Sequence, residues 1–171
     1  GTIATADIAD GAVTSVKTTG VGGNMKPAFQ AYMSGNLSAS NDTYTKLQVN
    51  TEEFDTDGAY DHSTNYRFTP QTSGKYFIYG STRVDPGTGN LTRLSISIYK
   101  NGSEVKQTDF FLNASSQDMS LLHTNTIGTV SLNGSSDYVE LYARLRTYNG
   151  SGIECKGGIN QTIFGGYKII T

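Results

Sequence analysis

The sequence predicts an all-β protein, folded as an antiparallel ten-stranded jelly-roll sandwich. Three observations support this class. Apolar residues recur at every second position in several segments, Asn-Gly pairs and Gly-rich turns separate these segments, and no amphipathic helix of useful length is present. Only 36% of the residues are hydrophobic, and eleven Tyr and seven Phe supply much of the bulk for a core. A chain of 171 residues fits one such domain.

Residues 1–24 differ from the rest of the chain because they contain no aromatic residue. Their apolar residues stand singly, at spacings that fit neither a helix nor a strand: Ile3, Ile8, Val13, Val16 and Val21. Such a segment cannot bury a core of its own, so we expect an extended stalk or attachment segment that orders against partner chains. Residues 25–171 would form the globular jelly-roll head, and a start at Gly1 suggests processing or a longer parent chain.

Four segments of the head alternate apolar and polar residues with a period of two. The apolar sets are Phe29, Ala31 and Met33; Thr45, Leu47 and Val49; Leu94, Ile96 and Ile98; and Val139, Leu141, Ala143 and Leu145. In the third segment the intervening residues are Ser95, Ser97 and Tyr99. This pattern predicts half-buried strands, with the apolar side chains inside and the polar side chains facing solvent.

Asn-Gly pairs mark the turns between the strands. Asn101-Gly102 and Asn133-Gly134 lie between alternating segments, and a third pair is Asn149-Gly150. Both residue types tolerate a positive φ, which two-residue turns between antiparallel strands require. We therefore expect tight hairpins at the first two pairs.

The stretch from Asn50 to Gly80 alternates acidic and aromatic residues, makes a turn, and enters a strand through Ser73–Tyr76. It resembles the signature of the complement component 1q globular head, the jelly-roll trimer family that includes tumour necrosis factor. The resemblance extends over the whole head, where the matching fragments stand in the family's order: Pro27–Phe29, Tyr44–Lys46, Tyr60–Asp61, Phe68–Pro70, Ile98–Gly102, Val130–Leu132, Asp137–Leu141 and Phe164–Tyr167. The resemblance implies a threefold homotrimer with aromatic side chains along the axis, and it does not identify a ligand.

The resemblance also implies which loops point outward. Both termini of this fold lie at the base, so alternate loops counted back from the last strand lie at the opposite, apical end. These loops are 84–90, 113–118 and 147–158, and long loops on a rigid scaffold often carry recognition. Their candidate ligand-binding residues are Asp85, Asn90, Gln117, Tyr148 and Asn149. Amide, carboxylate and aromatic groups together suit carbohydrate, by hydrogen bonding and stacking.

Composition and motifs argue against several other functions. The net charge is −2 with no basic run, so nucleic acid is not an expected partner. No apolar stretch approaches the roughly 20 residues that span a bilayer, so we expect no membrane insertion. The sequence contains no nucleophile elbow, phosphate loop or dinucleotide-binding motif, which argues against an enzyme.

Few residues suggest a metal or a disulfide. His62 and His123 lack partners at metal-ligand spacing. The acidic cluster Glu52, Glu53, Asp55 and Asp57 suits calcium better than glycosidase chemistry. We assign no metal site and no cofactor, and calcium remains an open alternative. The single Cys155 excludes an internal disulfide; we expect a small packed residue, with an interchain bond as the alternative.

The segment Ile8–Lys17 resembles short motifs in the stalks of bacteriophage fibres. Together with the head signature, it favours a non-enzymatic trimeric virion appendage or capsid decoration protein, of the phage tail-fibre or head-fibre type. Residues 1–24 would attach it to other virion proteins, and the head would bind a host-surface glycan or receptor. The alternatives are a secreted complement-like cellular binding protein and, third, a polysaccharide-degrading tailspike. Eight Asn-x-Ser/Thr sequons would predict heavy glycosylation in a secreted animal protein.

Overall fold

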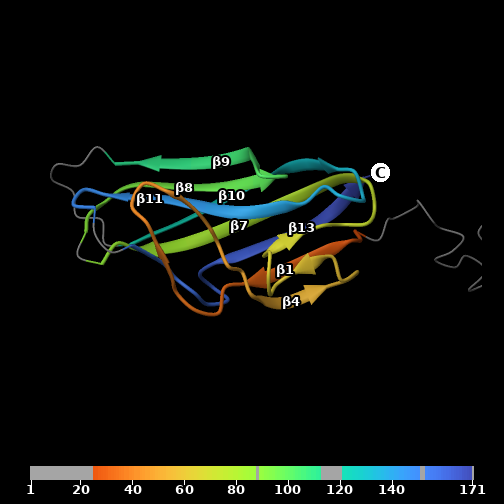
Figure 1. Cartoon of the computed structure of the whole chain (residues 1–171), viewed down its shortest axis with the longest axis horizontal. Coiled ribbons are helices and arrows are strands. Elements are labelled where there is room, and N and C mark those ends of the chain that lie inside the picture. Colours follow the sequence, from red (N-terminus) through yellow and green to blue (C-terminus); the bar gives the residue numbers. More distant parts are fainter. Residues whose placement is uncertain (1–24, 88, 113–120, 151–152, 171) are drawn as a thin grey trace, which may run out of the picture.

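A computed structural model describes residues 25–87, 89–112, 121–150 and 153–170. These residues form two antiparallel sheets packed face to face, with no helix among them (Figure 1). The all-β jelly-roll class is therefore confirmed. Within the same ranges no helix is long and apolar enough to cross a membrane. The expected stalk, residues 1–24, lies outside the described residues.

Sheet A has seven strands and contains both ends of the head. Across the sheet the order is β4 (Thr51–Asp55), β1 (Ala28–Tyr32), β13 (Ile163–Ile170), β7 (Gly74–Asp85) and β10 (Leu122–Leu132). Strand β12 (Ile153–Cys155) pairs with the far end of β7 and, on its other side, with β2 (Leu37–Ala39). Every one of these pairings is antiparallel.

Sheet B has six strands. Its order is β5 (Tyr60–Asp61), β6 (Arg67–Phe68), β11 (Val139–Thr147), β8 (Leu91–Lys100) and β9 (Ser103–Phe111), and β3 (Tyr44–Lys46) also pairs with β11. The described residues thus form thirteen strands where the sequence predicted ten. One of the short strands, β12, lies in the segment 147–158 that was expected to be an apical loop.

The core lies between the two sheets and is centred on Phe29. Its ring stacks on Phe68 at 4.4 Å and on Tyr60 at 4.8 Å, and it meets Phe164 edge-on at 5.1 Å between ring centroids. Aromatic pairs in these arrangements stabilise beyond the area that they bury. Thr45, which was predicted to face inward, is only half-buried. The other predicted inward residues are buried as expected: Phe29, Ala31, Met33, Leu47, Val49, Leu94, Ile96, Ile98, Val139, Leu141, Ala143 and Leu145.

One part of the alternation prediction is wrong. Ser95 and Ser97 were expected to face solvent, yet both are fully buried. The cause is the neighbouring edge strand β9, whose long side chains fold over these small residues. The Ser95 hydroxyl donates to Asp109, and the Ser97 hydroxyl donates to Glu104 at 2.9 Å.

The two Asn-Gly predictions have different outcomes. Asn101 and Gly102 have φ angles of 51° and 78° and join β8 directly to β9, so this hairpin is confirmed. The hairpin predicted at Asn133-Gly134 is wrong, because β10 belongs to sheet A and β11 to sheet B. This loop is instead a crossover, held by the Asn133 Oδ1 atom, which accepts three backbone N–H groups at 3.0 Å. A sequence pattern shows that the chain turns, but not whether the next strand pairs with the last.

The ends of the head lie together at what we call the base. Strand β1 pairs with β13, and the Lys168 N–H donates to the Pro27 carbonyl at 3.1 Å. Figure 1 shows the C-terminus at this end, and the loops after β7 and β11 at the other, which we call the apical end. The third predicted apical loop, 113–118, lies outside the described residues. For the loops after β7 and β11, the expected separation from the base is therefore present in the fold.

Candidate interaction surfaces

The outward side of sheet A carries a set of partly exposed aromatic and apolar side chains. Strand β7 alternates buried and half-buried residues, so Phe77, Tyr79 and Ser81 point away from the core. Pairing places Tyr79 level with Ile127 of β10 on one side and with Gly165 of β13 on the other. We call this surface the sheet A face; its main residues are Gln30, Phe54, Phe77, Tyr79, Ile127, Ile163 and Tyr167.

Gly165 makes room for Tyr79 to lie across the sheet A face. A Cβ atom at Gly165 would lie 2.4 Å from the Cζ and hydroxyl oxygen of Tyr79. With only hydrogen at that position, the Tyr79 ring crosses β13, and its hydroxyl donates to the Gln30 Oε1 atom at 2.5 Å. Gly165 therefore lets the Tyr79 ring lie flat on the sheet A face. A flat face of this kind is suited to close contact with another protein surface.

The same hydrogen-bonded chain reaches the edge strand β4. The Gln30 Nε2 atom donates to the Glu53 Oε2 atom at 2.5 Å, so one amide links Tyr79 to a carboxylate. Partial burial and, secondarily, the negative charge of Glu53 raise the pKa of Tyr79, which keeps the phenol protonated as a donor.

A pocket of about 420 Å³ opens on the sheet A face between β7, β10 and β13. Its apolar lining comes from Tyr79, Ile127 and Ile163, and its polar lining includes His123 and Asn125. Ile127 is 58% exposed. The strand register places Arg83 of β7 opposite His123 of β10. The Nε atom of Arg83 is buried and has no hydrogen-bond partner among the described residues. This pocket thus has an apolar floor and a polar rim that includes His123.

The structure brings some of the predicted apical ligand-binding residues together, but not all of them. The Tyr148 N–H donates to the Asn90 carbonyl at 2.9 Å, so these two loops lie side by side, and the Tyr148 side chain is 75% exposed. Asn149 follows Tyr148 and is exposed. Gln117 lies outside the described residues. Carbohydrate binding by these loops stays a prediction.

Asp85 is engaged within the fold itself. Its carboxylate accepts the Gly87 N–H at 2.9 Å and lies 3.3 Å from the Lys156 Nζ atom. The hydrogen bond from Gly87 and the charge of Lys156 lower the pKa of Asp85. This carboxylate therefore has a structural role in shaping the loop after β7.

The outward side of sheet B is a polar network that the sequence analysis missed. Tyr99 and Tyr142 pack at 4.3 Å between ring centroids, and Tyr44 meets Tyr99 at 5.9 Å. Ion pairs surround these rings: Lys46 with Glu140, Arg93 with Asp109, and Arg144 with Asp42. The signal was available, because Tyr and charged residues occupy the outward positions of the alternating segment 138–146.

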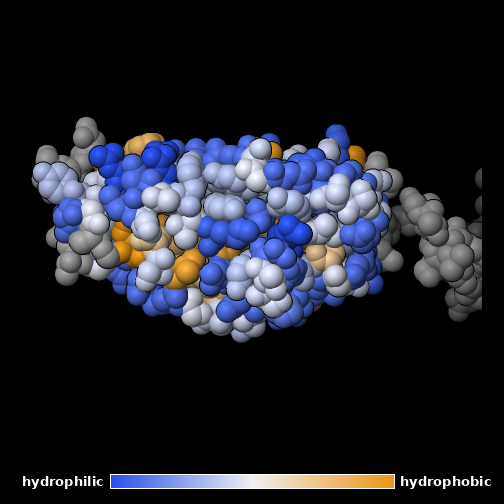
Figure 2. Space-filling view, in the orientation of Figure 1, coloured by the Kyte–Doolittle hydropathy of each residue, from blue (hydrophilic) through white to orange (hydrophobic). Residues whose placement is uncertain are grey.

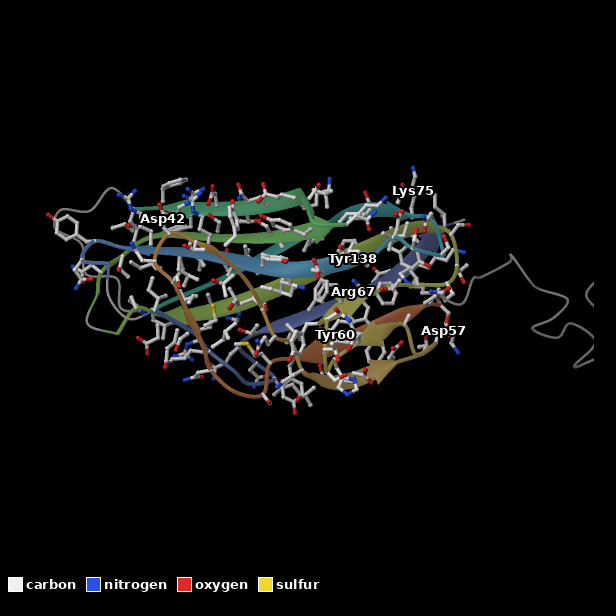
Figure 3. The ribbon with its side chains drawn as sticks, in the orientation of Figure 1. Asp42, Asp57, Tyr60, Arg67, Lys75 and Tyr138 are labelled. Carbon is white, nitrogen blue, oxygen red and sulfur yellow. The ribbon has the colours of Figure 1, made fainter. Side chains whose placement is uncertain are left out.

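The figures agree with this description of sheet B. Figure 2 shows this side of the molecule as mainly hydrophilic, with separate small hydrophobic patches. Figure 3 shows Arg67 beside Tyr138, where its guanidinium lies 4.4 Å from the ring centroid. The same view places Asp42 toward the apical end, and Asp57 and Lys75 at the base. A surface whose charges are already paired offers less to a partner than one whose charges are not.

The acidic cluster does not converge on one point. Glu52 pairs with His62 at 2.6 Å, Glu53 accepts from Gln30, and Asp55 accepts the Tyr60 N–H at 2.7 Å. In the described ranges no group of three His, Cys, Asp or Glu is placed to hold a metal ion. Calcium binding stays an untested prediction.

Cys155 is fully buried in β12. Burial raises the pKa of its thiol to about 12. The packed-residue interpretation is correct, and the interchain disulfide is not, because a thiol inside the core cannot reach another chain.

Comparisons with known proteins support the fold. No protein-family model matches the chain, and no curated protein matches it. Among solved structures, the Eiger TNF from S. frugiperda is similar, with a TM-score of 0.56 over 83% of this chain and 91% of that one. The two sequences are 11% identical, so the similarity shows a shared TNF-like jelly roll and no more than that.

Proposed function

We propose that this chain is a non-enzymatic binding module that assembles as a homotrimer through the sheet A face and presents its apical loops to an extracellular ligand. The observation that carries the proposal is the sheet A face itself. It exposes apolar and aromatic side chains at adjacent positions on neighbouring strands, whereas isolated surface apolar residues need no explanation. The TNF-like fold supports the same assembly.

Oligomerisation through this face is tested by one substitution at its centre. Ile127→Glu places a charge on the most exposed aliphatic residue beside the pocket, and we expect it to convert a trimer into a monomer. The matched control is Tyr148→Glu, which adds the same charge at an exposed residue of the apical loops. The mass of each variant is measured by light scattering, with circular dichroism to confirm folding. A wild-type chain that is monomeric at every concentration overturns the proposal.

Two biological settings fit such a module. A secreted, complement-like binding protein is supported by the similarity to Eiger TNF. A virion appendage, with a stalk attached to the particle, is favoured only by the phage-fibre resemblance of Ile8–Lys17, which lies outside the described residues. Co-sedimentation of the protein with purified particles, against recovery from the medium of secreting cells, separates the two settings. A tailspike activity would instead release soluble products from host polysaccharide.

A further inference from the structure

The outward side of sheet B carries more positive than negative charge where it reaches the apical end. Arg93 of β8 pairs with Asp109 at 2.7 Å, and Arg144 of β11 pairs with Asp42 at 2.9 Å. A third arginine, Arg146, is exposed, and within the described part of the chain its guanidinium has no ion-pair or hydrogen-bond partner. The arginines of this region therefore outnumber the carboxylates that pair with them.

The strand register makes this excess charge unfavourable. Arg146 stands directly opposite Arg93 in the pairing of β11 with β8. Like charges directly opposite each other on antiparallel strands destabilise the pair. Asp109 accepts from both the Nε and the Nη2 atoms of Arg93, at 3.1 and 2.7 Å, and is thus committed to that arginine. The charge of Arg146 remains, so an anion bound at this position would be stabilised by it.

An open aromatic ring stands on the other side of Arg93. Phe111 of β9 is opposite Arg93 in the pairing of β8 with β9. The Arg93 guanidinium lies over this ring, 4.5 Å from its centroid, and therefore covers one of its faces. Phe111 is nevertheless 63% exposed. Its uncovered face can pack against apolar C–H groups of a ligand.

Phe111, Arg93 and Arg146 thus form one row across three strands, which we call the apical row. Neighbouring strands are separated by about 4.8 Å, so the backbones at Phe111 and Arg146 lie roughly 10 Å apart. A single sugar ring with one substituent can bridge two side chains at this separation. The planar guanidinium of arginine matches a carboxylate with two parallel hydrogen bonds, which favours a ligand with both an apolar ring face and a carboxylate.

We propose that the apical row binds a carboxylate-bearing pyranose of an acidic glycan, with the carboxylate on Arg146 and the apolar face of the sugar ring on Phe111. Tyr148 follows two residues after Arg146, is 75% exposed, and extends the site toward the apical loops. The inference rests on the proposed binding function and names its ligand class. The apical row lies on the outward side of sheet B, so assembly through the sheet A face leaves it accessible.

Calorimetric titration of the full chain tests this site with a defined probe, the tetramer of galacturonic acid. The control ligand is the methyl-esterified tetramer, which keeps the sugar rings and removes their charge. We expect Arg146→Gln to raise the Kd for the acidic tetramer at least about tenfold, and Phe111→Ala to raise it about threefold or more. The matched control variant is Lys75→Gln, which removes an exposed cation at the base and should leave the Kd unchanged (Figure 3). Circular dichroism confirms that each variant is folded.

The outcomes separate this site from the proposed function. Binding of the acidic tetramer that is weakened by both apical-row variants, and by esterification of the ligand, supports the assignment. Equal binding of the two tetramers, an unchanged Kd in Arg146→Gln, or no binding to the wild type overturns the acidic-sugar site and leaves the trimeric binding module standing. Light scattering of the same samples tests the homotrimer separately, because all residues of the apical row belong to one chain.

Discussion

The packing of Tyr79 over Gly165 gives a prediction that can be worked from distances. Gly165 has no positive φ, so its backbone accepts alanine, but the new Cβ would lie 2.4 Å from the Tyr79 ring. The ring must swing outward and lose its hydrogen bond to Gln30. Overpacking costs about 1–3 kcal/mol, and reduced freedom of the unfolded chain returns about 0.4–1 kcal/mol. We therefore expect Gly165→Ala to lower the unfolding free energy by about 1–2 kcal/mol.

A double-mutant cycle isolates this contact from other effects of the substitution. In a Tyr79→Ala background the space above Gly165 is open, so Gly165→Ala should be neutral or slightly stabilising. Residues in direct contact typically show coupling energies of about 0.5–3 kcal/mol. Tyr79→Phe serves as the matched control, because it removes only the hydroxyl and should cost about 1 kcal/mol.

Urea unfolding at one fixed chain concentration measures the cycle, since assembly makes apparent stability depend on concentration. The urea concentrations at half-unfolding are compared only between variants whose unfolding free energy falls with the same slope against urea concentration. If Gly165→Ala costs the same with and without the Tyr79 ring, the reasoning is refuted. Such a result would mean that the strand backbone, and not the crossing ring, requires glycine at this position.

Three further predictions concern stability and reactivity. Gly134→Ala should destabilise far more than Gly102→Ala in urea unfolding, because both have a positive φ but only the Cβ at Gly134 meets backbone, 2.2 Å from Ser73 N. Backbone N–H donors lower the pKa of Asp61 below its ordinary value of 3.8. The contribution of this carboxylate to the free energy of unfolding is therefore fully present above pH 3.8 and is lost as the pH falls through its lower native pKa. Asp61→Asn should therefore flatten the acid limb of a plot of stability against pH. Cys155 should react with iodoacetamide at pH 8 only after unfolding, and rapid native labelling would contradict its burial.

The sequence by itself determined the fold class and much of the core. Period-two alternation depends only on the geometry of an extended chain with one buried face, so Leu94–Ile98 and Val139–Leu145 could be oriented without any knowledge of their partners. The Asn101-Gly102 hairpin was predictable for the same reason, since the two-residue turn is a local property of the backbone. The order of family-like fragments added the jelly-roll topology and the placement of the base.

The tertiary structure decided everything that depends on which strands become neighbours. Asn133-Gly134 reads like a hairpin, yet the chain crosses between sheets there, because strand pairing is set by the whole fold. Ser95 is buried because Asp109 of another strand covers it, which no local pattern records. The sheet A face assembles side chains from five strands that are far apart in the sequence. Its flat ring and its pocket arise from the strand register, which a single sequence specifies only indirectly.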